Sequence, residues 1–419
     1  LNVAVGQDAL GLTTTGDNNT AVGESALFAN TTADQNTAVG KSALVSNTTG
    51  ANNTAMGKSA LGSNTTGTQS VAVGVGAVED TTTGNNLSGV GFKALHQNTT
   101  GSSNAALGHS ALEANTTGSN NTAVGISALG SNTTGGQNVA ISKAMFTNTT
   151  GNDNIGIGFT SLNFNTTGAN NVAIGRDSLK ANTTASDNTA VGYQSLLDNT
   201  TGSSLVAVGR EALANNTTGA NNIAVGRSAL ITNTTGNFNT AMGDSALFSN
   251  TEGASNVAVG QSAGQFATTA ASSCFVGKDA AKGITGSKLN GDNNTCIGST
   301  SGLVLQDSAS GNTLVGAGCG AALTTAADNV FIGITAGSNM TTGGGNIIIG
   351  NSDGEAVDVA HQIIMGNSVT GVGQDQFTFG RGGLDCNIAF GATSITAPSD
   401  QRYKEDIADA TAGLAFIKD

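Results

Sequence analysis

Residues 19–27 read Asn-Thr-Ala-Val-Gly-Glu-Ser-Ala-Leu, and nearly the same phrase begins again at Asn36, a step of 17. The glycine in the middle of the phrase marks the period. It occurs at Gly6, Gly23, Gly40, Gly57, Gly74, Gly91, Gly108 and Gly125, and again at Gly158, Gly175, Gly192, Gly209, Gly226, Gly243, Gly260 and Gly277. A fixed period of this length predicts a repeat architecture in which each unit packs mainly against its neighbours.

The first half of the phrase has the alternation of a β-strand. Thr20 and Val22 would point to one side and Ala21 and Gly23 to the other. The Val22 position is aliphatic in other copies, so we interpret it as the core column. We expect the small Ala21 and Gly23 to form a face that another chain approaches closely. Ala26-Leu27 would close the interior of the coil from another side.

The second half of the unit contains the turn. Most copies carry Asn-Thr-Thr-Gly, as at residues 47–50, and Asn and Gly tolerate the positive φ of tight turns. Stacked copies of this Asn would form a ladder of amides along the axis. Coils stacked in the hydrogen-bond direction advance about 4.8 Å each, so some 22 coils would make a rod of about 100 Å.

These features predict an all-β fold, a parallel β-roll or β-solenoid of about 17-residue coils. A helical solenoid is disfavoured because the units are too short for a helix pair and because Gly and Asn-Thr-Thr break helices. Disorder is disfavoured because the apolar positions keep their register.

Composition limits the partners. The net charge is −13 and the sequence holds no Lys/Arg cluster, so nucleic acid and anionic membranes are poor candidates. No run of 18 apolar residues would insert into a membrane. The sequence begins in the middle of a phrase and shows no signal peptide, so we expect that Leu1 is not the native start.

No cofactor or metal site is expected. Cys274, Cys296, Cys319 and Cys386 form no CxxC motif and no common column, and we interpret them as free, buried thiols. The three histidines lie far apart in the sequence. Gly-x-Gly phrases such as residues 156–158 lie in no βαβ unit, which argues against nucleotide binding.

The phrase Asn-Thr-Ala-Val-Gly-x-x-Ala-Leu resembles the head repeat of trimeric autotransporter adhesins over roughly residues 1–350. That resemblance implies a left-handed parallel β-roll intertwined as a homotrimer. The period of 17 is longer than the coil of that family.

Changes in the repeat suggest four segments. Residues 1–277 hold regular repeats, with a one-residue deletion at Ser142, where the glycine is lost. Residues 278–350 hold irregular repeats, with an insertion at residues 282–289 that we expect to form a loop. Residues 351–397 would be a terminal variant β region or neck, and residues 398–419 form a separate segment.

That last segment contains Pro-Ser-Asp-Gln-Arg-Tyr-Lys-Glu-Asp, which resembles the start of the intramolecular chaperone domain of phage tailspikes, tail fibres and endosialidases. The resemblance implies a self-cleavage dyad with Ser399 as nucleophile and Lys404 as base, a role that needs a lysine of depressed pKa. The alternative is an ordinary turn before an amphipathic helix.

The sequence therefore favours a structural homotrimeric fibre, a phage or virus-like tail fibre shaft that attaches to a host surface, located on the virion or outside the cell. It is not expected to be an enzyme beyond single-turnover self-cleavage. One alternative is a bacterial surface adhesin or extracellular filament, and another is the non-catalytic carrier of a glycan-degrading tailspike. With no Trp and only Tyr193 and Tyr403, a sugar-binding face is not expected on the rod.

Overall fold

The computed structural model describes residues 1–352, 354, 358–382 and 384–392. The chain divides into two compact units, residues 1–269 (unit 1) and residues 270–419 (unit 2), and each is treated by itself. Every regular element among the described residues is a β-strand. The all-β solenoid of 17-residue coils is thus confirmed, and a helical solenoid is excluded for the part of the chain that the structure describes.

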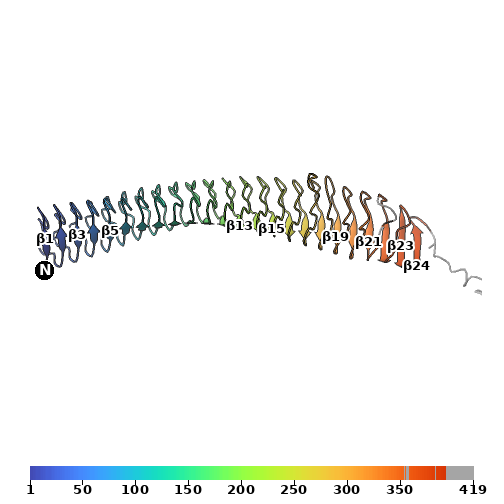
Figure 1. Ribbon diagram of the computed structural model, residues 1–419, viewed down its shortest axis with the longest axis horizontal. Coiled ribbons are helices and arrows are strands. Elements are labelled where there is room, and N and C mark those ends of the chain that lie inside the picture. Colours follow the sequence, from blue (N-terminus) through green and yellow to red (C-terminus); the bar gives the residue numbers. More distant parts are fainter. Residues whose placement is uncertain (353, 355–357, 383, 393–419) are drawn as a thin grey trace, which may run out of the picture. The chain divides into compact units, whose positions relative to one another are not determined.

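Unit 1 consists of sixteen coils, each contributing one strand of three residues (Figure 1). Consecutive strands pair in parallel, and residues one coil apart face each other, as Ala21 faces Ala38. The strands are β1 (Val3–Val5), β2 (Thr20–Val22), β3 (Thr37–Val39), β4 (Thr54–Met56), β5 (Val71–Val73), β6 (Ser88–Val90), β7 (Ala105–Leu107), β8 (Thr122–Val124), β9 (Val139–Ile141), β10 (Ile155–Ile157), β11 (Val172–Ile174), β12 (Thr189–Val191), β13 (Val206–Val208), β14 (Ile223–Val225), β15 (Thr240–Met242) and β16 (Val257–Val259).

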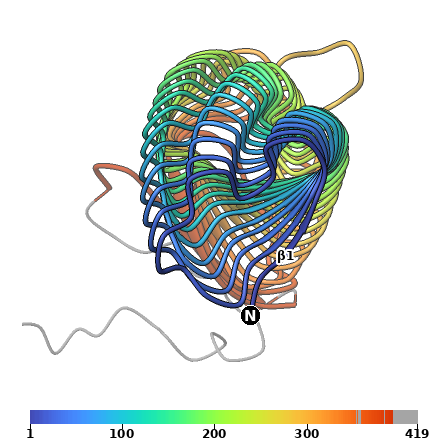
Figure 2. The ribbon, with the colours of Figure 1, turned by 90° about the vertical axis from the view of Figure 1, so that its left-hand side faces the viewer.

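Unit 2 is built from the same kind of coil, with variations. Its strands are β17 (Cys274–Val276), β18 (Thr295–Ile297), β19 (Thr313–Val315), β20 (Val330–Ile332), β21 (Ile347–Ile349), β22 (Ile363–Asn367), β23 (Gln376–Arg381) and β24 (Leu384–Ala389). They pair in parallel up to β23, and β24 folds back antiparallel on β23. The expected loop at residues 282–289 is present and projects from its coil (Figure 2). A Cβ atom on Gly286 would meet no atom within 4 Å outside its chain neighbours, so this part of the loop is open to solvent.

The interior of the coil is formed by the opposite side of the strand from the one predicted. Ala21 is fully buried together with Ala26 and Leu27, whereas Val22 is 37% exposed. The interpretation of the Val22 position as the core column is therefore wrong. The reason is the narrowness of the coil. Leu27 folds back over the strand, and the space that remains holds nothing larger than the methyl group of Ala21.

The predicted Ala/Gly face for a second chain is wrong for the same reason. The backbone of the same chain requires glycine at position 23, without any contact to a second chain. Its φ is +139°, and a Cβ atom there would lie 2.5 Å from the carbonyl oxygen of Gly40 in the next coil. Ser142 replaces this glycine once, at the deletion, and keeps a positive φ of 75°.

Positive φ angles occur elsewhere than in Asn-Thr-Thr. In the second coil they fall at Ser25 (56°), Leu27 (50°) and Gln35 (59°), so the expected conformational role of Asn30 is also corrected. The asparagine acts through its side chain. Asn47 Nδ2 donates to Asn30 Oδ1 of the preceding coil (3.3 Å) and to the carbonyl oxygen of Gly50 (2.9 Å). The predicted amide ladder is confirmed.

A second ladder, which was not predicted from the sequence, runs through the asparagine just before each strand. The backbone amide of Asn36 donates to Asn19 Oδ1 (2.9 Å), and Asn36 Nδ2 donates to the carbonyl oxygen of Gly50 (3.0 Å). Asn19, Asn30 and Asn36 are all buried. Most of these buried amide groups are paired with the neighbouring coil or with a carbonyl of their own turn, as burial of a polar group requires. The exceptions in the Asn30 ladder are Oδ1 of Asn64 and of Asn250, which have no partner because the next coil has Thr81 or Ala267 at that position.

Unit 2 fills the same interior with the large and small residues exchanged. The Ala21 position becomes Phe275, Leu314 or Phe331, all buried. The Leu27 position becomes Gly320 in the coil of Leu314 and Gly337 in the coil of Phe331. A Cβ atom on Gly337 would lie 2.5 Å from the ring of Phe331. The two positions therefore share one volume.

This exchange makes a prediction for unit 1. Replacing Ala190 by Leu should overfill the coil that contains Leu196 and cost about 1–3 kcal/mol of the free energy of unfolding. Combining Ala190→Leu with Leu196→Gly should recreate the Leu314–Gly320 pair and recover part of that loss, which urea unfolding of both single variants and the double variant would measure. Strictly additive losses would contradict the shared volume.

The ladder gives a second prediction. Asn132 Nδ2 donates to Asn115 Oδ1 (2.8 Å) and its Oδ1 accepts from Asn148 Nδ2 (2.8 Å). Asn132→Ala should cost about 2 kcal/mol because it leaves buried amide groups without partners. The control is Thr117→Ala, an exposed side chain in a neighbouring turn. Equal thermal shifts for the two variants would count against the ladder.

Candidate functional site

One candidate surface is the outward side of the strands. We call it the strand face and define it as the first and third residues of β1–β16. It is partly exposed throughout, with Val22 at 37%, Met56 at 45% and Leu107 at 52%. The third position holds only Val, Ile, Leu or Met, and the first holds Val, Ile, Ala, Thr or Ser. No charged residue occurs in these sixteen strands, all of which the structure describes.

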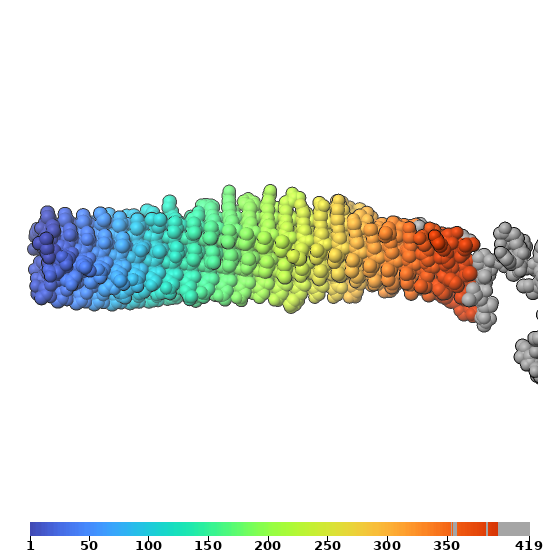
Figure 3. Space-filling model, turned by 90° about the horizontal axis from the view of Figure 1, so that it is seen from below, coloured from blue at the N-terminus to red at the C-terminus, as the bar shows by residue number. Residues whose placement is uncertain are grey.

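The strand face is regular because the coils are in register. The space-filling view shows the side chains of unit 1 in rows that repeat from coil to coil (Figure 3). Contiguous apolar surface of this extent is uncommon on monomeric proteins and is typical of a surface that contacts another molecule.

The second candidate surface is formed by the residues that directly follow the glycine position, which we call the outer column. In the middle of unit 1 it alternates between apolar or aromatic and cationic residues. Two rings contact their neighbours in the column: Phe92 stacks on His109 with centroids 5.2 Å apart, and the Arg210 guanidinium lies 5.8 Å from the centre of the Tyr193 ring. From Val75 to the end of unit 1 its members are Val75, Phe92, His109, Ile126, Lys143, Phe159, Arg176, Tyr193, Arg210, Arg227, Asp244 and Gln261.

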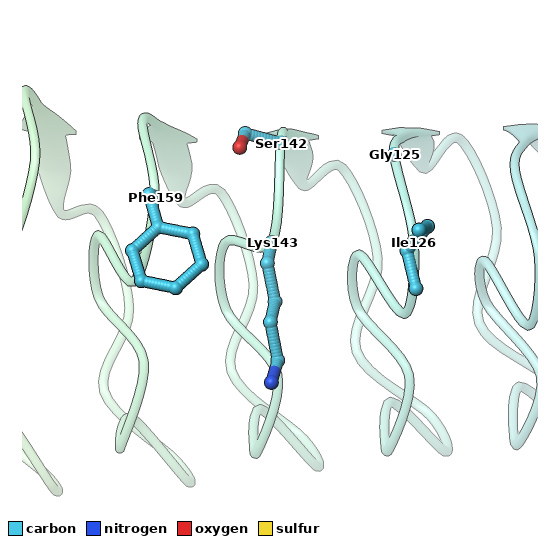
Figure 4. A pocket seen from close by; sticks show the side chains of 5 residues that line it. All are labelled: Gly125, Ile126, Ser142, Lys143 and Phe159. Atoms are coloured by element: carbon cyan, nitrogen blue, oxygen red, sulfur yellow. The ribbon is translucent and has the colours of Figure 1, made fainter.

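A pocket of about 310 Å³ lies in the outer column at the deletion. Gly125, Ile126, Ser142, Lys143 and Phe159 line it, and in Figure 4 Lys143 lies between Ile126 and Phe159, which come from the coils on either side. The strands keep their pairing across the shortened coil, since Ile141 faces Val124 on one side and Ile157 on the other. The missing residue is thus absorbed outside the strand, where the pocket lies.

The sequence alone marks Ser142 only as the site of a deletion and predicts no sugar-binding face on the rod. The signal in the sequence was the lost glycine together with the 16-residue step to Gly158. The outer column itself was hard to recognise because its members lie a whole coil apart in the sequence and form a cluster only after stacking.

The cations of the outer column differ in their pairing. The Arg176 Nε atom lies 3.3 Å from Oδ2 of Asp177, and the Lys180 Nζ atom lies 3.2 Å from the other carboxylate oxygen, Oδ1. Burial acts to raise the pKa of Asp177, but hydrogen bonds from Thr160 and Lys180 and the charges of Lys180 and Arg176 hold it below its usual value. Asp177 therefore stays ionised and offsets Arg176. Lys143 has no carboxylate partner within unit 1, all of which is described, and its Nζ lies 5.7 Å from the centre of the Phe146 ring.

The cysteines form no site in the described chain. All four are free; Cys296 and Cys319 are buried as expected, whereas Cys274 and Cys386 are only half-buried. Burial raises the pKa of the Cys319 thiol to about 12. Burial, with Cys319 and Cys274 nearby, raises the pKa of Cys296 as well. No group of three or more His, Cys, Asp or Glu side chains among the described residues is arranged to hold a metal ion.

The proposed cleavage residues Ser399 and Lys404 lie outside the described residues, so their dyad stays a prediction. Tyr403 lies there too. Among the described residues there is no helix long and apolar enough to cross a membrane.

The thiols offer a test of the core of unit 2. In the folded protein at about pH 8, iodoacetamide should modify Cys274 and Cys386 but leave Cys296 and Cys319 intact, because the two buried thiols are shielded and protonated. Mass spectrometry of the peptides would measure the modification, and all four should react after denaturation. Modification of Cys319 as fast as that of Cys274 would contradict the packing.

Comparison with known proteins identifies no relative from which a function could be inferred, so the function has to be argued from the fold and from these two surfaces. A scan against models of protein families finds no match to this chain. A search of curated proteins likewise finds no significant relative.

Proposed function

We propose that this chain is a structural shaft that assembles as a homotrimer through its strand face and serves in attachment to a host surface. The observation that supports the proposal is the strand face itself: sixteen consecutive strands present aliphatic or small neutral side chains to the outside and no charge. A role as a virion fibre and a role as a bacterial surface adhesin share this assembly, and the proposal covers both.

The gain from covering the strand face would be hydrophobic. Burial of apolar surface contributes about 25 cal/mol per Å², and the outward residues of every coil would add to it. A single coil has only a thin interior, and in the coil of residues 19–35 its buried apolar residues are Ala21, Ala26, Leu27 and Ala33. Assembly would supply a second core beside it, on the side of the strand that the single chain leaves exposed.

A second copy of the chain is the partner that fits the periodicity. The strand face repeats once per coil, at about 4.8 Å. Another copy has the same spacing over the same length, so its side chains could stay in register along the whole of unit 1. Charges are absent from the face, so copies would meet without repulsion. The trimeric number comes from the resemblance to adhesin heads.

The proposal includes a maturation step, because residues 398–419 resemble the start of an intramolecular chaperone domain. There Ser399 would act as the nucleophile and Lys404 as the base of a single self-cleavage after the chaperone has guided trimer formation. The reaction would occur once per chain, so the chain would not be an enzyme that turns over a separate substrate.

Assembly can be tested by placing charges on the strand face. The triple variant Ile157→Lys, Ile174→Lys and Val191→Lys puts three ammonium groups on consecutive coils, where a partner would bury them at a cost of several kcal/mol each. We expect the molar mass from light scattering to fall from that of a trimer to that of a single chain, while the β-sheet circular dichroism spectrum is retained.

The matched control uses the exposed second threonine of Asn-Thr-Thr in the neighbouring turns. The triple variant Thr167→Lys, Thr184→Lys and Thr201→Lys introduces the same charge and should stay a trimer, because these residues lie in the turns and outside the strand face. A monomeric wild-type chain, or a strand-face variant that stays trimeric, would refute the proposed assembly.

A further inference from the structure

The pocket at the deletion combines a ring, an aliphatic side chain, an unpaired cation and a hydroxyl group. We propose that this pocket and the adjoining part of the outer column bind carboxylated saccharides, with Phe159 as the stacking platform and Lys143 as the partner of the carboxylate.

The rings of the outer column are available for stacking. Phe159 is 52% exposed and Tyr193 is 41% exposed, in a chain that contains only 4% aromatic residues. Two coils separate them, so the rings lie about 10 Å apart along the column. The apolar faces of sugar rings pack on such exposed aromatic side chains. The contact buries apolar surface of the aromatic ring, which favours binding, and its preferred stacking geometry orients the sugar.

The cations favour an acidic ligand. Unit 1 contains eight Lys and Arg residues in a chain of net charge −13, and six of them lie in the outer column. Those six are Lys41, Lys58, Lys143, Arg176, Arg210 and Arg227. A cation attracts a carboxylated ligand only where no carboxylate of the protein already offsets its charge, so the pairing of these six decides where such a ligand would bind.

Pairing selects Lys143 among these six. Lys41 contacts Glu24 at 3.0 Å, and Arg227 contacts Asp244 at 2.9 Å. Arg176 and Arg210 pair with the acids that follow them. Within unit 1 this leaves Lys58 and Lys143 without a carboxylate, and only Lys143 has a ring of the column as its neighbour. The pocket is therefore the place where an unpaired ammonium group and an exposed aromatic ring meet.

The rim supplies groups for hydroxyl recognition. Ser142, which replaces the glycine, is exposed and lines the pocket. Its hydroxyl group can both donate and accept hydrogen bonds, as sugar hydroxyls require. A nucleic acid strand would also find rings and cations here, but its denser phosphate charge is opposed by the negative charge of the chain.

This inference rests on the proposed attachment function, for which it names a ligand class, but binding needs only the surface of one chain. The proposed glycan binding and the proposed assembly can therefore be refuted independently of each other. The binding test uses the full chain, and light scattering on the same sample records the oligomeric state.

The probes are tetragalacturonate and a hyaluronan tetrasaccharide, with methyl-esterified tetragalacturonate as the uncharged control. Titration calorimetry should show binding of at least one acidic probe and at least tenfold weaker binding of the ester. Lys143→Gln and Phe159→Ala should each weaken the binding about tenfold, the loss expected from one charged hydrogen bond or one stacked ring.

Two matched variants keep the test specific. Lys58→Gln removes the other unpaired cation of the column, and Phe238→Ala removes a ring that is 63% exposed but lies in a different column. Both should bind like the wild type. Insertion of Ser after Lys143, which restores the regular repeat step, should abolish binding while keeping the β-sheet spectrum.

The proposal is overturned if neither acidic probe binds, if the ester binds equally well, or if Lys58→Gln weakens binding as much as Lys143→Gln. Tighter binding of a single-stranded oligonucleotide of equal charge would also overturn it, because the column would then recognise phosphate.

Discussion

The stacking of coils through buried asparagine amides is the constraint on which the rest of the structure depends. The asparagines of the Asn30 and Asn19 ladders are buried, and most of them hydrogen-bond to the equivalent residue of the neighbouring coil. An unpaired buried amide group costs about 1–3 kcal/mol, whereas one hydrogen bond contributes about 1 kcal/mol to stability. A coil that slipped along the sequence would leave both ladders unsatisfied, so the ladders hold each coil in register with the next.

The apolar interior is less strictly constrained in residue type than the asparagine ladders. The coil leaves a limited space beside the strand. Most coils of unit 1 fill it with Ala at the strand and Leu after the bend, whereas the coils of Leu314 and Phe331 in unit 2 place the large residue at the strand and Gly after the bend. The second solution also relieves the backbone, because the position after the bend has a positive φ: 52° at Leu196 and 56° at Gly320. Leu in this conformation is unfavourable and is held there by its packing.

The glycine bend separates two surfaces of different chemistry. Before it, the strand face is aliphatic and uncharged, which suits burial against equal copies. After it, the outer column carries exposed rings and cations, which suits a polar, acidic ligand. Because both surfaces repeat with the coil, a small change in one coil acts locally. The deletion at Ser142 leaves the pairing of β9 with β8 and β10 intact and changes only the shape of the outer column.

The sequence by itself determined the period, the strand, the Asn30 ladder and the loop at residues 282–289, because each depends on residue types that recur at fixed spacing or on a break in that spacing. It did not determine which side of the strand is inside. Alternation divides Thr20 and Val22 from Ala21 and Gly23, but only the closed coil, in which Leu27 returns over the strand, leaves room for Ala21 and excludes Val22. Tertiary structure also decided the outer column and its pocket, because Ile126, Lys143 and Phe159 lie on successive coils, far apart along the chain, and become neighbours only when those coils stack.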